Sequence, residues 1–439
     1  MKSLSFGRHL PCRGVLHGLA VQRSGLVDSL QLQRAVMTHF TEQLELSRHK
    51  DVQATHSGAV NDLDVDITER RYLLSGHSDG SLALHDLQNP YEDDPCGDGA
   101  LDRLTYKLVG TVSAGNRGAH KRSIETVQWF PLDTGIFTSS GTDRLLKIWD
   151  ANRLQTAEEY SFSGIVHCHH MSPVATKHNL VAVGTESSVV KLVDPRAGSA
   201  THCLRGHREG AVRAVRWSNT DEFLLATGGL TVDLKKIFFL NLPPAADTTH
   251  DGSVNGLEFS PSGHHLLTIG TDQKMFAWDT LTGRKQATRF PTLSHIKRRS
   301  VKFCLTDGGA ESFLFIPTGS SVTSFGLGQF GQPGKVRKLY GHYNSVNCTA
   351  FHGPGQVMLS GGNDHKILVW SVRGDIDYGD FRQEQRETRV ERLARQEGAE
   401  QRTEGITSAT EGQVVAQLQD TWSDDDDDDD DDDGGGDGD

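Results

Sequence analysis

The chain has 439 residues, of which 36% are hydrophobic and 47 are glycine, so it can bury a sizeable core interrupted by many turns. Its formal charge is −13, but the Asp run from 424 to 433 and two later aspartates supply twelve negative charges, so the remainder is close to neutral. That balance argues against direct, phosphate-driven DNA contact. No apolar run reaches the roughly 18 residues that would span a membrane.

Six cysteines are scattered along the chain, and none belongs to a C-x-x-C pair. Neither a disulfide framework nor a zinc ribbon is indicated, and we expect no metal and no cofactor. A reducing compartment fits this usage best.

The amino-terminal flank divides into an extension over residues 1–23, expected to be disordered, and an amphipathic helical arm over 24–47. Its apolar positions recur at helical spacing; they are Leu26, Leu30, Met37, Phe40 and Leu44. A closed β-ring needs no external helix to complete its core, so this stripe predicts docking into another protein. The alternative is that the arm packs back on its own ring.

A repeated unit fills the middle of the chain. Three apolar-alternating runs of four to six residues, separated by Gly, Ser, Asn and Asp, recur from copy to copy, a pattern typical of short antiparallel strands. The clearest copies span 342–370, 250–279 and 123–150. Spacings near 40 to 45 residues are typical of propeller blades.

Seven such units predict an all-β, seven-bladed β-propeller over residues 51–375. Residues 51–55 precede the first unit and are expected to pair with the last blade, which closes the ring and hides its edges. Two units are irregular: His85 stands where Trp is expected, and 225–241 lacks a Trp-Asp ending.

One histidine cluster could be mistaken for a metal site. His167-Cys-His-His170 begins the third unit, where a buried structural histidine is expected, and no second Cys/His pair lies at ligand spacing. We therefore favour a structural role over metal binding.

The carboxyl-terminal flank, residues 376–439, is charged and poor in large apolar residues, so we expect it to be mostly disordered. Ser423 stands directly before the Asp run and could be phosphorylated by an acid-directed kinase. A plain solubilising tail is the alternative.

The repeats resemble the WD-repeat family, with Gly206-His207 and Gly341-His342 openings and Trp149-Asp150 and Trp278-Asp279 endings. In that family a His, a Ser or Thr, an Asp and a Trp form a buried hydrogen-bond relay in each blade. The matching structural relay residues here are His250, Thr268, Asp272 and Trp278 in one blade and His342, Ser360, Asp364 and Trp370 in another.

A narrower resemblance is to the Cockayne syndrome group A family. It is carried by the helical Gly-Leu-Val-Asp-Ser-Leu-Gln-Leu segment at 25–32, by Ser-Ile-Glu-Thr-Val-Gln-Trp-Phe-Pro at 123–131, by His-His-Met-Ser-Pro-Val-Ala-Thr-Lys-His at 169–178, and by Thr-Trp-Ser before the acidic end.

That resemblance implies a nuclear substrate receptor of a cullin-RING ubiquitin ligase in transcription-coupled nucleotide excision repair, which performs no chemistry itself. The implied partners are the damaged-DNA-binding adaptor propeller protein, the cullin-RING ligase core, the Cockayne syndrome group B remodeller and stalled RNA polymerase II. The helical arm would enter the adaptor. Such receptors often carry a Trp-Asp-x-Arg box; here Val193-Asp194-Pro-Arg196 has Val in place of Trp.

The main alternative is a WD-repeat scaffold of a chromatin or RNA-processing complex without a ubiquitin role. The hypothesis that the protein is an enzyme has no positive support, because no Ser/His/Asp set is recognisable as a nucleophilic triad.

Overall fold

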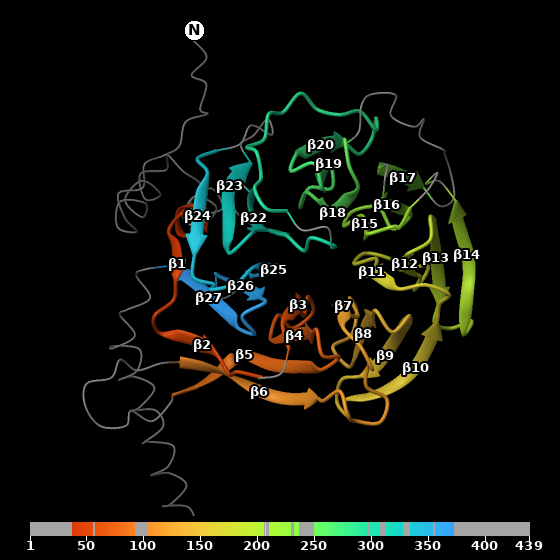
Figure 1. Ribbon diagram of the computed structural model, residues 1–439, viewed down its shortest axis with the longest axis horizontal. Coiled ribbons are helices and arrows are strands. Elements are labelled where there is room, and N and C mark those ends of the chain that lie inside the picture. Colours follow the sequence, from red (N-terminus) through yellow and green to blue (C-terminus); the bar gives the residue numbers. More distant parts are fainter. Residues whose placement is uncertain are drawn as a thin grey trace, which may run out of the picture. The chain divides into compact units, whose positions relative to one another are not determined.

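The computed structural model describes the ring and little of its flanks. The chain divides into two compact units, 1–373 and 374–439, and all described residues lie in the first. The described residues are 37–55, 58–92, 104–205, 207, 210–229, 232–236, 250–296, 299–306, 312–327, 334–353 and 356–372. Within them, short strands form seven separate sheets around a central opening (Figure 1).

Almost all of the regular structure is β. Residues 37–42 are helical. The first fourteen strands along the chain are β1 (Leu44–Leu46), β2 (Lys50–Val52), β3 (Val60–Val65), β4 (Tyr72–His77), β5 (Leu82–Glu92), β6 (Leu104–Val112), β7 (Ile124–Trp129), β8 (Ile136–Gly141), β9 (Leu145–Asp150), β10 (Gln155–Ser161), β11 (Val166–Met171), β12 (Val181–Thr185), β13 (Val189–Asp194) and β14 (Ser199–Arg205).

The remaining strands are β15 (Ala214–Trp217), β16 (Leu224–Gly228), β17 (Val232–Lys236), β18 (Val254–Phe259), β19 (His265–Gly270), β20 (Met275–Asp279), β21 (Cys304–Leu305), β22 (Ser312–Thr318), β23 (Ser321–Leu327), β24 (Arg337–Tyr340), β25 (Val346–His352), β26 (Val357–Gly362) and β27 (Ile367–Val372). The all-β propeller expectation is confirmed. Two sheets, β15–β17 and β18–β20, have three strands in the described residues, so seven complete blades stay a prediction.

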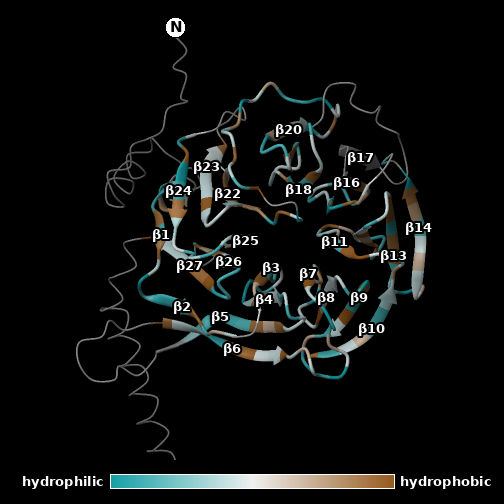
Figure 2. Ribbon diagram, viewed as in Figure 1, coloured by the Kyte–Doolittle hydropathy of each residue, from teal (hydrophilic) through white to brown (hydrophobic). Residues whose placement is uncertain are grey.

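Each sheet runs from an inner strand at the central opening to an outer strand at the rim. In the second sheet, β7, β8 and β9 are buried, whereas β10 is mostly exposed. Both faces of the inner strands are covered because neighbouring sheets stack against them. Figure 2 accordingly shows hydrophobic residues mainly along the strands and hydrophilic residues mainly in their connections.

The hydrophobic core is divided among the contacts between neighbouring sheets. Between the first and second sheets, for example, Leu74 packs in one cluster with Trp129, Phe137 and Trp149. The Phe137 ring lies edge-on to Trp129 at 5.7 Å and stacks on Trp149 at 5.8 Å. Further clusters of this kind join the other adjacent pairs of sheets, so stability depends on every neighbour being present.

Ring closure is made by β1, the first strand in the described residues. β1 pairs antiparallel with β27, with Leu44 opposite Val372 and Leu46 opposite Trp370. The expectation that residues 51–55 close the ring is therefore wrong. β2, which covers part of that segment, instead runs parallel to β6 at the rim of the first sheet.

The structure also shortens the helical arm. Residues 37–42 are helical, but Leu44 belongs to β1 and is only 1% exposed, in one cluster with Phe315 and Trp370. Leu44 therefore cannot anchor a partner, because it fills the core of the last sheet. Residues 24–36, with Leu26 and Leu30, lie outside the described residues. Within the described part, no helix is long and apolar enough to cross a membrane.

Replacing the closing leucine tests the role of β1. Leu44→Ala is expected to lower the free energy of unfolding by about 2–5 kcal/mol, because it leaves a cavity between the sixth and seventh sheets. The matched control is Leu46→Ala on the same strand, where the side chain is 41% exposed and the expected change is within about 0.5 kcal/mol. Chemical denaturation measures both; equal losses would contradict closure by β1.

Candidate functional site

The inner strands line a central channel that is the main cavity in the described residues. Its volume is about 860 Å³, and β3, β7, β11, β15, β18 and β25 contribute side chains to it, together with residues 300–305. Ligands commonly bind in such concave sites, so the channel is a candidate binding site.

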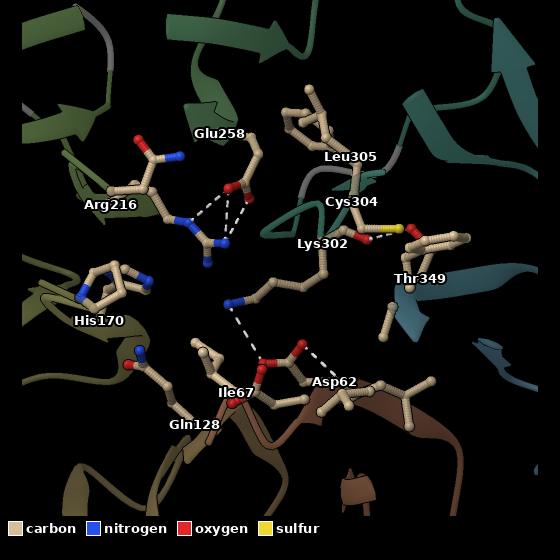
Figure 3. Close-up of a pocket in the computed structure, with 18 of the residues that line it drawn as sticks. Asp62, Ile67, Gln128, His170, Arg216, Glu258, Lys302, Cys304, Leu305 and Thr349 are labelled. Carbon is tan, nitrogen blue, oxygen red and sulfur yellow. Dashed lines mark hydrogen bonds and ion pairs between the residues drawn. The ribbon is translucent and has the colours of Figure 1, made fainter. Parts of the chain in front are cut away.

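Two cations and their carboxylate partners occupy the middle of the channel (Figure 3). The Arg216 guanidinium pairs with Glu258 of the next sheet, with Nη2 2.7 Å from Oε2 and Nε 3.1 Å from Oε1. Lys302 extends from the sixth sheet across the channel, where Nζ donates to Thr126 Oγ1 at 2.9 Å and lies 3.5 Å from Asp62 Oδ2. The Lys302 contacts join sheets that are not neighbours, whereas the Arg216–Glu258 pair joins two adjacent ones.

The channel carboxyl groups are shifted toward their protonated forms. Burial raises the pKa of Asp62 against the opposing effect of Lys302, and it raises the pKa of Glu258 against that of Arg216. Burial also raises the pKa of Asp64 to about 7, although the Trp129 N–H donated to Oδ2 at 2.7 Å favours the charged form. The channel therefore changes its charge near neutral pH.

Side chains on the inner strands also bond the open edge of the next inner strand. Asp62 Oδ2 accepts the Val127 N–H at 3.0 Å, as Asp64 does for Trp129. Gln128 in turn both accepts from the Met171 N–H, at 2.7 Å, and donates to the Met171 carbonyl, at 3.2 Å. These bonds satisfy backbone groups that have no strand partner.

Two histidines of the cluster at 167–170 have structural roles, and only His170 bonds the open edge of the next inner strand. The His169 ring bonds the hydroxyls of Thr138 at 2.8 Å and Ser140 at 2.7 Å, on β8 of the preceding sheet. His170 Nδ1 accepts the Trp217 N–H at 3.0 Å. Burial lowers the pKa of both rings well below its usual value, which keeps them neutral. No group of three potential metal ligands occurs among the described residues.

The relay residues identified from the repeats lie in contact. His250 Nδ1–H donates to Asp272 at 2.8 Å, and its Nε2 accepts from Thr268 Oγ1 at 2.9 Å, while Trp278 Nε1–H donates to the same hydroxyl at 3.0 Å. The last sheet repeats this order with distances of 2.7–2.9 Å; its members are His342, Asp364, Ser360 and Trp370.

The structure shows a third relay that was not predicted from the sequence. His120 donates to Asp143 at 2.8 Å, and Ser139 bonds both His120 and Trp149 Nε1 at 2.7 Å. The same residue types at nearly the same spacing are present when the 123–150 copy is extended back to His120, so this relay could have been predicted. In the two irregular units, His207 bonds Thr227 at 3.0 Å, and His85 Nε2 bonds the Gln53 carbonyl at 2.9 Å.

The relays have the residue types of a catalytic triad but not its accessibility. Ser139, His120 and Asp143 are hydrogen-bonded in series, yet Ser139 and His120 are both 0% exposed. The Ser139 oxygen is also bonded to the Trp149 indole N–H. A nucleophile must reach its substrate, so these chains stabilise blades and do not supply a reaction centre.

The predicted adaptor-binding residues fall on two separate parts of the ring. At the helical segment, Met37 and Phe40 are half-buried, Thr38 and Thr41 are buried, and the Gln356 side chain contacts the Met37 sulfur. The end of the arm therefore packs on the ring. The alternative prediction was that the whole arm packs on the ring in this way.

The second part is the end of β13. The Asp194 carboxylate accepts the Arg196 backbone N–H at 3.0 Å, which fixes the turn, and the Arg196 side chain is exposed. Leu26, Leu30 and Ser423 lie outside the described residues.

Comparisons with known proteins identify the repeat. The family model described as "WD domain, G-beta repeat" matches residues 111–150, 198–232, 245–279 and 334–371. The WD repeat-containing protein ATCSA-1 of Arabidopsis thaliana is 29% identical over 415 residues, which cover 76% of this chain and 90% of the plant protein.

Two further relatives are more distant. The Serine-threonine kinase receptor-associated protein of Gallus gallus is 23% identical over 55% of this chain and 65% of its own length. The Ribosome biogenesis protein WDR12 homolog of Drosophila pseudoobscura pseudoobscura is 26% identical over 58% of this chain and 64% of its own.

A relay hydroxyl can be tested by truncation. Ser360→Ala removes the partner of both His342 and Trp370, so we expect the free energy of unfolding to fall by about 1–3 kcal/mol. Ser199→Ala, at an exposed position on β14, is the control, with an expected change within about 0.5 kcal/mol. Urea titration measures both variants, and equal effects would argue against the relay as a source of stability.

The raised pKa of Asp64 predicts a pH dependence of stability. Because this carboxyl group holds its proton more tightly in the folded chain, its contribution to the free energy of unfolding falls as pH rises from about 4 to about 7. Asp64→Asn keeps an acceptor for Trp129 and is expected to flatten this fall, by up to about 1.4 kcal/mol per pH unit. Urea unfolding at several pH values, with exposed Glu42→Gln as control, measures it; parallel curves for wild type and Asp64→Asn would contradict the assignment.

Proposed function

The chain is a WD40-repeat protein, and from this premise we propose that it is a substrate-recognition subunit of a cullin-RING E3 ubiquitin ligase acting in transcription-coupled nucleotide excision repair. WD-repeat proteins act as scaffolds for protein interactions. The subunit is non-catalytic: it raises the effective concentration of a target lysine near the conjugating enzyme. It works in the nucleus.

The observation that carries this proposal is the similarity to ATCSA-1 of Arabidopsis thaliana, because it extends over 90% of that protein. A similarity of repeats alone would not be expected to extend so far. It agrees with the resemblance of residues 25–32, 123–131 and 169–178 to the Cockayne syndrome group A family.

The proposed partners are those implied by that resemblance. The damaged-DNA-binding adaptor propeller protein would hold the arm through Leu26, Leu30, Met37 and Phe40, and it links the chain to the cullin-RING core. The Cockayne syndrome group B remodeller and stalled RNA polymerase II are the other proposed partners. Leu44 is removed from the set of anchors, because it is buried in β1.

The turn at Asp194 and Arg196 is proposed as a second contact with the adaptor. The exposed Arg196 side chain is available to a partner, while the Asp194 carboxylate is held by the Arg196 backbone N–H. An arginine fork suits a carboxylate of the partner.

A second candidate function is a scaffold in an RNA-processing assembly. The observation that favours it is the similarity to the Ribosome biogenesis protein WDR12 homolog over 58% of this chain. It shares the ring but does not require binding of the adaptor.

Co-purification with the damaged-DNA-binding adaptor separates the two candidates. The intact chain is expected to bind. Leu30→Asp combined with Phe40→Asp is expected to abolish the complex, because each charged group would enter an apolar groove of the adaptor at a cost of about 2 kcal/mol or more. Glu42→Lys, on the exposed side of the same helix, is the control for a change of charge.

A melting curve of each variant shows whether the ring stays folded. Failure of the intact chain to bind the adaptor, or full binding by the folded double variant, would refute the receptor mechanism. Recovery of the intact chain with pre-ribosomal particles in place of the adaptor would support the second candidate.

A further inference from the structure

The central channel contains hydrogen-bond donors beyond those that its own carboxylates use. Arg216 bonds Glu258 through Nε and Nη2, and no partner of Nη1 is found among the described residues. The Arg216 side chain is 37% exposed, so Nη1 can reach a solute in the channel. A guanidinium with one free edge suits an oxyanion.

Lys302 points toward Arg216 from the other side of the channel (Figure 3). Its Nζ has one short bond, to Thr126 Oγ1, and a longer contact of 3.5 Å with Asp62. An ammonium group has three N–H donors, so at least one remains for a ligand. The Lys302 carbonyl accepts the Thr349 N–H at 3.0 Å, which fixes the backbone that carries this amine.

His170, which lines the same channel, adds a third, neutral donor. Its Nδ1 accepts the Trp217 N–H, so in the neutral ring the proton lies on Nε2. His170 is 7% exposed and lines the channel, and no hydrogen bond of Nε2 is found in the part of the chain described. Arg216 and Lys302 are the two charges that act most on this ring. An imidazole N–H at the wall of a cavity can donate to a ligand held there.

We propose that the channel binds a tetrahedral oxyanion, the phosphoryl group of a small phosphate monoester, between Arg216, Lys302 and His170. Three donors from three different sheets match the three terminal oxygens of such a group, whereas a carboxylate offers two. A cavity of about 860 Å³ leaves room for the remainder of a small ligand. This inference does not rest on the proposed ligase role, although Met37 of the arm also lines the channel.

The nearby carboxylates set the strength of this site. Glu258 already neutralises part of the Arg216 charge, and Asp62 part of that of Lys302. Removing the Glu258 charge should therefore free the guanidinium and strengthen anion binding, whereas removing the Lys302 charge should weaken it. Opposite effects of two neutralising variants would not arise from a nonspecific surface ion.

Isothermal titration calorimetry of the full chain with inorganic phosphate, O-phosphoserine, sulfate and acetate tests the proposal at constant ionic strength. We expect one site for the first three probes and weaker binding of acetate. Lys302→Gln, which keeps a donor for Thr126, should lower phosphate affinity about ten-fold or more, and Glu258→Gln should raise it. Lys274→Gln removes an exposed lysine paired with Asp251 and should leave affinity unchanged.

The paired variant Arg216→Gln with Glu258→Gln removes both charges together and avoids leaving one of them alone in the channel. It should also bind phosphate about ten-fold more weakly than the wild type. The proposal would be overturned if the wild-type chain does not bind at millimolar probe, or if Lys302→Gln and the paired variant both bind phosphate as tightly as the wild type does. Melting curves identify any variant that fails to fold, and adaptor co-purification reports on the proposed function separately.

Discussion

The structure depends on how the open edges of its inner strands are satisfied. Each sheet ends at the channel with a strand that has no strand partner on one side, and unbonded backbone groups there would be costly. Asp62 and Asp64 bond the second inner strand, Gln128 bonds the third, and His170 bonds the fourth. Polar side chains face the channel for this reason, and the apolar core lies at the contacts between sheets.

The same constraint explains why the channel differs from the relays in accessible chemistry. A relay such as that of His342, Ser360 and Trp370 satisfies its members among themselves and is buried between sheets. Arg216 and Lys302 instead face a cavity, and their carboxylate partners do not use all of their N–H donors. Groups that stabilise a blade and groups that are free to bind are thus separated in space, which lets one fold carry a variable interaction site.

The repeats and two relays could be predicted because their signals are local: a His, a hydroxyl, an Asp and a Trp recur within about thirty residues in each unit. The strand that closes the ring could not be predicted. Leu44-Glu-Leu46 is three residues long and continues the apolar spacing of Met37 and Phe40, so periodicity favoured a helix. The ion pairs of the channel also could not be predicted from the sequence, because Lys302 and Asp62 come together only when the sixth and first sheets are placed around one axis.

Closure by β1 also has a consequence for how the protein is made on the ribosome. The strand that completes the last sheet is among the first to be synthesised, and its partner β27 is among the last of the ring. Chains emerge at about 5–20 residues per second, so for many seconds the nascent ring has an unpaired edge at each end. Such edges invite pairing with other chains, and a chaperone that shields them during translation would protect this protein until its two ends meet.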